Sequence, residues 1–286
     1  MNKQYQKIYD VVRADMEKVD NCLLLNPELQ PELDSELENF LKAPSKRIRS
    51  LMTILYLRAS KMYLLPAHYE LLASVELIHN ASLIHDDVID ESKLRRGRKS
   101  LNAKFDNQLA VISGDYLLGE VLKKLVKIGS IPVIDVFADT VKSMCLGEVN
   151  QYFNKYKKTD IEKYVEKSSQ KTASLFESAL KASIMLAGND VDDKSLEFAS
   201  NFGLAFQIRD DLLNIKNSDI TKSASDLEEG IYNAPVILAD NINDGIEKTK
   251  DLLNNYVNCA KLCIDDLENS IYKKSLIELL ELLEDV

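Results

Sequence analysis

Glycine and proline are scarce in this chain, which contains nine glycines and six prolines among 286 residues. These two residues break helices, and the rest of the composition is rich in Leu, Lys, Glu, Ala and Ser, so we expect a nearly all-helical protein. No stretch rich in glycine, serine or proline divides the sequence into two parts. We therefore expect one all-α domain over residues 1–286, long enough to bury a sizeable core.

Long uncharged hydrophobic runs are also missing. No apolar segment approaches the ~20 residues that a membrane-spanning helix needs. The first residues, MNKQYQKIYDVVRADMEK, lack the apolar centre of a signal peptide. We expect no membrane span and a cytoplasmic location. The formal net charge is −10 and no broad basic face is visible, which argues against a nucleic-acid partner.

The four cysteines, at positions 22, 145, 259 and 263, follow neither a disulfide spacing nor a zinc-ligand spacing. Cys259 and Cys263 share a face of a predicted helix, but no second pair of Cys or His residues stands near them. We interpret all four as ordinary buried thiols.

Apolar residues recur with a helical period along most of the chain. The expected helices cover residues 31–43, 49–65, 66–91, 107–128, 133–153, 161–187, 195–215 and 270–286. Residues 216–235 have weak periodicity and are expected to form a loop. A loop this long in a compact domain is often functional.

Two acidic motifs, LIHDDVID and QIRDDLLN, each lie near the end of an apolar helix and give the main functional signal. Asp86 and Asp90 are four residues apart, as are Asp210 and Asn214, so each pair lies on one helix face. Unpaired buried carboxylates are costly, which predicts a cation between them. Oxygen ligands without His or Cys suit Mg²⁺, which commonly bridges protein carboxylates and phosphate.

Basic residues stand close to these motifs in the sequence. Arg95 and Arg96 follow the first motif and can form forked contacts with phosphate oxygens. KRIR adds Lys46 and Arg49, and Lys171 precedes Thr172 in a helix with small side chains. Alternatively, the acids are solvated or pair with nearby arginines, and KRIR is a solvated basic turn. Acids, cations and an apolar interior together predict a substrate with a diphosphate head and a hydrocarbon tail.

Several motifs, taken in order, resemble those of the trans-isoprenyl diphosphate synthases, also called polyprenyl synthetases. The resemblance covers residues 40 to 240 approximately, and its motifs are SKRIRS, ELIHNASLIHDDVIDES, RRGR, AVISGDYLL, GEVNQ, KTASLF, GLAFQIRDDLLN and DLEEG. It implies a single-domain helical bundle with a central cavity, of the isoprenoid synthase type. It also implies a homodimer, and two acidic motifs that face each other across the cavity.

The resemblance also implies residue roles. Mg²⁺, about three ions in total, is expected at Asp86, Asp87, Asp90, Asp210 and Asp211. The positions that match the isopentenyl diphosphate site are Lys46, Arg49, His79 and Arg96. Those that match the allylic diphosphate site are Arg95, Lys171, Thr172 and Gln207. The residues expected to act in catalysis are Asp86, Asp90, Arg95, Lys171 and Asp210. His79 could equally be a core histidine that is satisfied by its neighbours.

The implied reaction condenses isopentenyl diphosphate with an allylic diphosphate, farnesyl or geranylgeranyl diphosphate, by metal-assisted ionisation, condensation and elimination. Ala81 and Ser82 lie one helical turn before the first acids, where aromatic side chains would block a growing tail. Their small size predicts a medium- or long-chain all-trans product, octaprenyl-like, for a quinone side chain.

Four departures from the family pattern keep alternatives open. SKRIRS lacks the usual double glycine and proline, the second motif ends in Asn214, Lys222 aligns loosely, and Ile231 replaces a frequent lysine. The alternatives are a geranylgeranyl diphosphate synthase, a terpene cyclase, a non-catalytic regulatory subunit of a prenyl synthase, or a helical scaffold protein.

Overall fold

The computed structural model describes residues 3–217, 230 and 232–286, except for the side chains of residues 216 and 217. Lys222 and Ile231 lie outside the described residues. The helices of the first half are α1 (Lys3–Val11), α2 (Arg13–Cys22), α3 (Pro31–Lys42), α4 (Ile48–Ala59), α5 (Pro66–Ile89), α6 (Leu101–Lys104) and α7 (Asn107–Ile128). Those of the second half are α8 (Ile131–Phe153), α9 (Ile161–Ser168), a π-helical turn η1 (Ser169–Ala173), α10 (Ser174–Leu186), α11 (Asp193–Asn217), α13 (Ala234–Leu238), α14 (Ile242–Cys263) and α15 (Ile271–Glu284).

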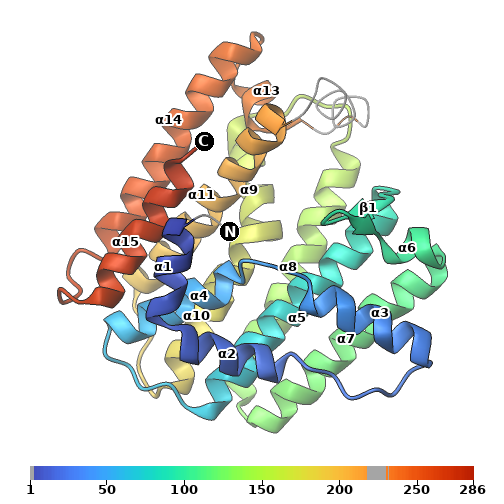
Figure 1. Ribbon diagram of the computed structural model, residues 1–286. Coiled ribbons are helices and arrows are strands. Elements are labelled where there is room, and N and C mark those ends of the chain that lie inside the picture. The colour runs from blue at the N-terminus through green and yellow to red at the C-terminus, as the bar shows by residue number, and fades with distance from the viewer. Residues whose placement is uncertain (1–2, 218–229, 231) are drawn as a thin grey trace.

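The described elements are helical except for one short antiparallel hairpin of β1 (Leu94–Arg95) and β2 (Arg98–Lys99). The prediction of an all-α fold is therefore confirmed. α5 packs along α7, α11 packs along α14, and α10 lies among α4, α5, α8 and α11 (Figure 1). α4 is buried on nearly all its faces, because its apolar residues cover the whole helix surface rather than one stripe.

Local sequence signals explain where several helices begin. Pro31 and Pro66 occupy the first helical positions of α3 and α5, where the missing N–H costs no hydrogen bond. Asp106 accepts a hydrogen bond from the backbone N–H of Leu109 at 2.7 Å and caps α7. Asp160 caps α9 in the same way.

Two of the predicted helices are interrupted. The helix expected over residues 49–65 ends at Ala59, because Lys61 adopts a left-handed conformation (φ 57°) and Met62 N–H bonds back to Leu57 O at 2.8 Å. The helix expected over residues 161–187 contains the π-helical turn η1 in its middle. The hydrophobic pattern gives no sign of this turn, which packs against α8 and α11.

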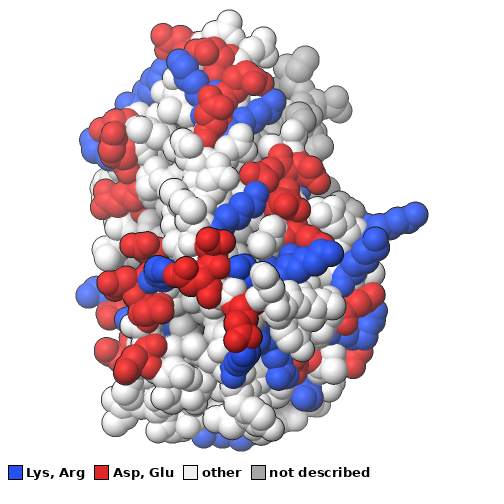
Figure 2. Space-filling model, turned by 90° about the vertical axis from the view of Figure 1, so that its left-hand side faces the viewer, with Lys and Arg blue, Asp and Glu red and all other residues white. Residues whose placement is uncertain are grey.

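The surface over the C-terminal helices carries intermingled acidic and basic side chains (Figure 2). Lys261 on α14 pairs with Glu284 on α15 at 3.1 Å, and Lys194 pairs with Asp266. The expectation of four buried thiols is wrong, because Cys145 and Cys259 are exposed and Cys22 and Cys263 are only half-buried; all four cysteines are free. Among the described helices, none is both long enough and apolar enough to cross a bilayer.

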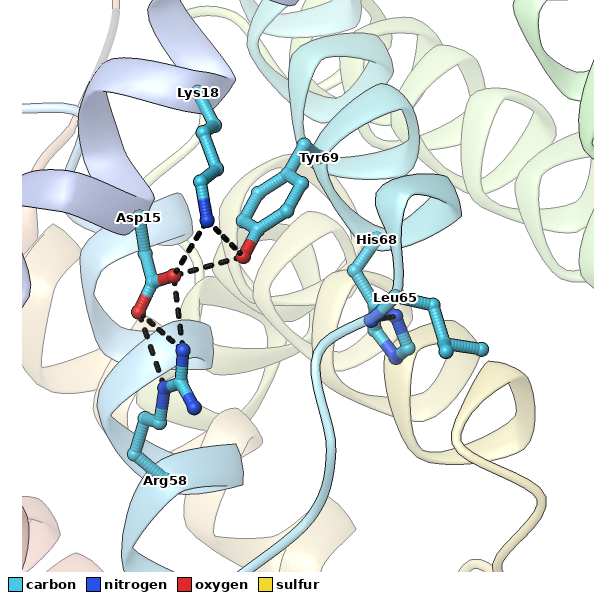
Figure 3. Close-up of polar contacts among 6 residues, drawn as sticks. All are labelled: Asp15, Lys18, Arg58, Leu65, His68 and Tyr69. Carbon is cyan, nitrogen blue, oxygen red and sulfur yellow. Dashed lines mark hydrogen bonds and ion pairs between the residues drawn. The ribbon is translucent and has the colours of Figure 1, made fainter.

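A buried polar cluster fixes α2 against α4 and α5 (Figure 3). The guanidinium of Arg58 donates from both Nε and one terminal nitrogen to the carboxylate of Asp15, at 3.1 and 2.8 Å. The hydroxyl of Tyr69 donates to the same carboxylate at 2.8 Å. Nearby, His68 Nδ1 accepts from Leu65 N–H at 2.9 Å, so its Nε2–H donates to Ser183 O and ties the start of α5 to α10.

Candidate active site

The first acidic motif lies in the last turn of α5, where the helix changes from buried to half-buried. The pKa of Asp86 is raised to about 6, chiefly by burial; Lys171 and Arg95 oppose this shift, whereas Glu148 and Asp90 add to it. The pKa of Asp90 is also raised, chiefly by burial. These two carboxylates therefore carry charge that the protein stabilises poorly by itself.

Asp87 points to a different partner. Its Oδ1 accepts hydrogen bonds from two nitrogens of Arg95, with Arg95 Nε at 2.9 Å, and the side chain is only 2% exposed. Asp87 Oδ2 has no hydrogen-bond partner within the described part of the chain. A metal role for Asp87 stays a prediction, whereas its role in holding Arg95 is visible in the structure.

The hairpin that follows α5 explains how Arg95 reaches Asp87. Arg95 pairs with Arg98 across the two strands, and the turn between them consists of Arg96 (φ 52°) and Gly97 (φ 76°). Two consecutive residues with positive φ give the tight turn that joins short antiparallel strands. RRGR thus forms a hairpin that turns the chain back toward the end of α5. The motif by itself did not predict this hairpin.

The second acidic motif lies on α11. Asp210 keeps an exposed surface, but partial desolvation raises its pKa, and the charges of nearby cations, Arg209, Lys46, Arg49 and Arg95, work in the opposite direction. Since Arg95 lowers the pKa values of Asp86 and Asp90 as well, its charge acts on acids of both motifs. The two motifs therefore share one electrostatic environment.

Asp211 belongs to a buried hydrogen-bond network. Its Oδ2 accepts from the hydroxyl of Tyr164 at 2.7 Å, and its Oδ1 accepts from Gln207 Nε2 at 2.9 Å. The hydroxyl of Thr172 donates to Gln207 Oε1 at 2.7 Å, which links η1 to α11. Asn214, together with Lys171, Thr172, Gln207 and Asp211, lines a cavity of ≈ 120 Å³ beside this network.

A buried cation, Arg49, lies next to the acidic motifs. Arg49 is 7% exposed, and its Nε finds no hydrogen-bond partner among the described residues. Burial lowers the pKa of Arg49 to about 10, although Glu76 and Asp210 raise it. The guanidinium lies 4.7 Å from the ring centre of Phe176, a favourable cation–π position. A buried cation with an unused donor suits an anionic ligand.

His79 and Arg96 extend this basic region. Burial, followed by the charges of Arg49, Arg96 and Arg95, holds the pKa of His79 well below its usual value, so the imidazole is neutral. Burial and the neighbouring Arg47 and Arg95 lower the pKa of Arg96. The cations act unfavourably on one another, and a bound diphosphate would relieve that repulsion.

Lys46 lies beside the second motif. Burial and Arg209 lower the pKa of Lys46, while Asp210 raises it. Its neighbour Arg47 adopts a left-handed conformation (φ 44°) in the segment that lacks the family glycines. Hydrogen bonds from Arg47 to Asp20 (2.6 Å) and to Leu41 O (2.8 Å) hold this conformation.

Lys171 lies in η1, and the structure gives it a partner that sequence reasoning missed. Its Nζ is 2.5 Å from Glu148 Oε2 and 3.9 Å from Asp86 Oδ2. Burial would lower the pKa of Lys171, but Asp86, Glu148 and Asp90 outweigh it and raise that pKa. Glu148 lies in GEVNQ, one of the segments that resemble the family, and this position was the only indication in the sequence that Glu148 belongs to the site.

The donor set fits a divalent cation that is shared with a ligand. No group of three or more His, Cys, Asp or Glu side chains in the described ranges is arranged to hold a metal by itself. Asp86, Asp90 and Asp210 nonetheless have raised pKa values and only oxygen donors. Oxygen donors that are too few to enclose an ion match Mg²⁺, which completes its shell with water and phosphate.

Ala81 and Ser82 lie one turn before these acids on α5. Ala81 is buried, while Ser82 is half-buried and its hydroxyl donates to His79 O at 2.9 Å. No aromatic side chain occupies either position, as the sequence requires.

Comparisons with known proteins agree with this site. The model of the polyprenyl synthetase family matches residues 30–273. A prenyl transferase of Synechocystis sp. is 33% identical over 297 residues, covering 92% of each chain. The octaprenyl diphosphate synthase of Escherichia coli is 35% identical over 242 residues, covering 82% of this chain and 74% of the relative.

Solved structures show the same fold. A decaprenyl diphosphate synthase from Rhodobacter capsulatus superimposes with a TM-score of 0.89 at 25% identity, covering 98% of both chains. A polyprenyl synthase from Caulobacter crescentus, solved with calcium and isoprenyl diphosphate, gives a TM-score of 0.89 at 26% identity, covering 99% of this chain and 98% of that one. The chain is a helical prenyltransferase. It belongs to the polyprenyl synthetase family.

The opposite environments of Asp86 and Asp87 predict opposite effects on stability. The folded-state pKa of Asp86, about 6, lies above the ordinary value of 3.8, so the folded state loses stability relative to the unfolded state as the pH rises through that window. Without metal at pH 7.5, Asp86→Asn should therefore increase the free energy of unfolding by about 2 kcal/mol. The gain should vanish at pH 4.

Asp87→Asn is the matched control, because it removes the charged partner of Arg95. It should lower the free energy of unfolding by about 2 kcal/mol at pH 7.5. Urea denaturation in the presence of a chelator measures both variants. Equal destabilisation by the two variants would contradict the interpretation of Asp86 as a carboxylate whose charged form is disfavoured in the folded protein.

Proposed function

We propose that this chain condenses isopentenyl diphosphate with farnesyl or geranylgeranyl diphosphate, and releases an all-trans, octaprenyl-like polyprenyl diphosphate. The observation that carries the proposal is that η1 joins the two acidic motifs. Lys171 Nζ lies 3.9 Å from Asp86 Oδ2, and the adjacent Thr172 reaches Asp211 through hydrogen bonds with Gln207. The names of the relatives, among them octaprenyl and decaprenyl diphosphate synthases, support the substrate class and the long product. A quinone side chain would be the use of such a product.

Two groups of cations would bind the two diphosphates. Lys46, Arg49 and Arg96, with the neutral His79, would hold isopentenyl diphosphate. Arg95 and Lys171, with Thr172 and Gln207, would hold the allylic diphosphate. Mg²⁺ at Asp86, Asp90 and Asp210, with Asp87 and Asp211 beside them, would supply positive charge that stabilises the departing pyrophosphate.

The chemistry needs positioning more than acid–base groups. The allylic carbon–oxygen bond breaks, and its electron pair leaves with the pyrophosphate. The double bond of isopentenyl diphosphate then forms the new carbon–carbon bond, and a proton passes to the pyrophosphate. Lys171 and Arg95 neutralise the leaving group in a partly buried site, where charge interactions are strong. His79 is neutral and needs only to accept or donate a hydrogen bond.

The direct test is an assay with the purified chain, Mg²⁺, farnesyl diphosphate and radiolabelled isopentenyl diphosphate. We expect pyrophosphate release that a chelator abolishes, and an octaprenyl-like product on reversed-phase chromatography. Asp210→Asn should reduce the rate at least a hundredfold, because it removes a charged ligand of the Mg²⁺ that would stabilise the departing pyrophosphate. A geranylgeranyl-length end point would instead assign a geranylgeranyl diphosphate synthase, and no turnover by the chain alone would assign a regulatory subunit.

Chain length tests the role of the small residues on α5. We expect Ala81→Phe to shorten the product without abolishing turnover, because an aromatic ring would block the path of the tail. Since Ala81 is buried, a second variant at the half-buried Ser82, Ser82→Phe, guards against a folding defect. Products of unchanged length from two folded variants would show that the tail does not pass this face.

We also propose that the enzyme is a homodimer that forms through α7 and α8. Large apolar side chains remain exposed along these helices: Ile112, Leu122 and Val126 on α7, and Leu146, Val149 and Phe153 on α8. On each helix they follow the spacing of a single face. Large apolar side chains exposed along one face of a helix in this number are typical of an interface between subunits.

The double substitution Leu122→Asp and Val126→Asp should convert the dimer to a monomer, since it places buried charges in the interface. Leu262→Asp on α14 is the matched control, because Leu262 is equally exposed (72%) and lies away from α7 and α8. Sedimentation equilibrium measures the mass of each variant. A monomeric wild type, or a dimer that survives the double substitution, would refute this interface.

A further inference from the structure

Glu148, on α8, makes a close ion pair with Lys171 of η1. Glu148 Oε2 and Lys171 Nζ are 2.5 Å apart, and the side chains are only 24% and 30% exposed. The same nitrogen is 3.9 Å from Asp86 Oδ2. Lys171 therefore lies between two acids and is bound to Glu148 rather than to the acid of the first motif.

The helices around this pair approach each other closely. A Cβ atom on Gly147 would lie 3.1 Å from the backbone nitrogen of Lys171 and 3.1 Å from the Cβ of Gln170, so only glycine allows this contact without displacement. Asn150 Nδ2 donates to Gln170 Oε1 at 3.1 Å, one turn further along α8. Three nearby residues of α8, Gly147, Glu148 and Asn150, thus contact the segment that contains Lys171.

A lysine side chain has a flexible four-carbon stem, so its direction depends on its partners. Without Glu148, the nearest acid to Lys171 is Asp86. An ion pair there would occupy a carboxylate that the proposed function assigns to Mg²⁺. With Glu148 present, Lys171 keeps one partner on α8, and its remaining N–H donors stay available to a diphosphate.

We propose that Glu148 is a positioning residue, which holds Lys171 toward the allylic diphosphate and away from Asp86. This inference rests on the proposed function of the site. The sign of the effect separates positioning from simple electrostatics. Removing a negative charge near a bound anion should strengthen anion binding if charge alone matters, whereas losing the orientation of Lys171 should weaken it.

The test uses Glu148→Gln, Glu148→Asp and Lys171→Met. We expect Glu148→Gln to lower kcat/KM for the allylic diphosphate about 10- to 100-fold, as is common when a supporting residue is lost, with KM for isopentenyl diphosphate unchanged. Glu148→Asp should restore part of the loss. In the Lys171→Met background, Glu148→Gln should have no further effect, because the two residues act as one unit.

Calorimetric binding of inorganic pyrophosphate in the presence of Mg²⁺ gives a readout that does not need turnover. Glu148→Gln should weaken this binding. Glu247→Gln, which breaks an exposed ion pair with Lys250 on α14, is the control and should leave both readouts unchanged. Tighter pyrophosphate binding by Glu148→Gln, or additive losses with Lys171→Met, would overturn the inference. A wild type that binds pyrophosphate without turnover would refute the proposed function alone.

Discussion

The site depends on two adjacent groups of like charges that are partly withdrawn from water. Desolvation raises the pKa values of Asp86, Asp90 and Asp210 and lowers those of Arg49 and Arg96. Arg49 is buried, Asp86 and Asp90 are half-buried, and Asp210 and Arg96 keep an exposed surface. The acidic group and the basic group have opposite charges, but few direct ion pairs join them. A diphosphate with its divalent ions carries both signs of charge, so it satisfies the two groups at once. The protein is thus preorganised for this ligand, because its own side chains neutralise the two groups only in part.

The helical scaffold keeps these groups in place through a small number of close contacts. The Cβ that Gly203 lacks would lie 2.6 Å from the Cα of Ala173, so α11 touches the backbone of η1. Gly147 makes the corresponding contact from α8. Held from two sides, residues 169–173 form a π-helical turn instead of a regular α-helix, and such turns occur often at functional sites. The packing of the bundle therefore determines where Lys171 and Thr172 point.

Local patterns were sufficient to predict most of the long helices and the acidic faces. Asp86 and Asp90 share a face because a helix repeats every 3.6 residues, and this depends on no distant contact. The Glu148–Lys171 pair and the φ of 44° at Arg47 depend on segments far apart in the chain, so no local pattern could reveal them. The same reason applies to Asp87, whose sequence position suggests a metal ligand although its carboxylate contacts Arg95 in the hairpin.

The most direct test of the shared site is a crystal structure with Mn²⁺ and a non-cleavable thio analogue of an allylic diphosphate. Anomalous scattering would locate the ions independently of the side chains. The account predicts ions on both motifs, at Asp86 and Asp90 and at Asp210, all bound to one diphosphate that also contacts Arg95 and Lys171. Ions bound to one motif only, with the other turned to solvent, would contradict it.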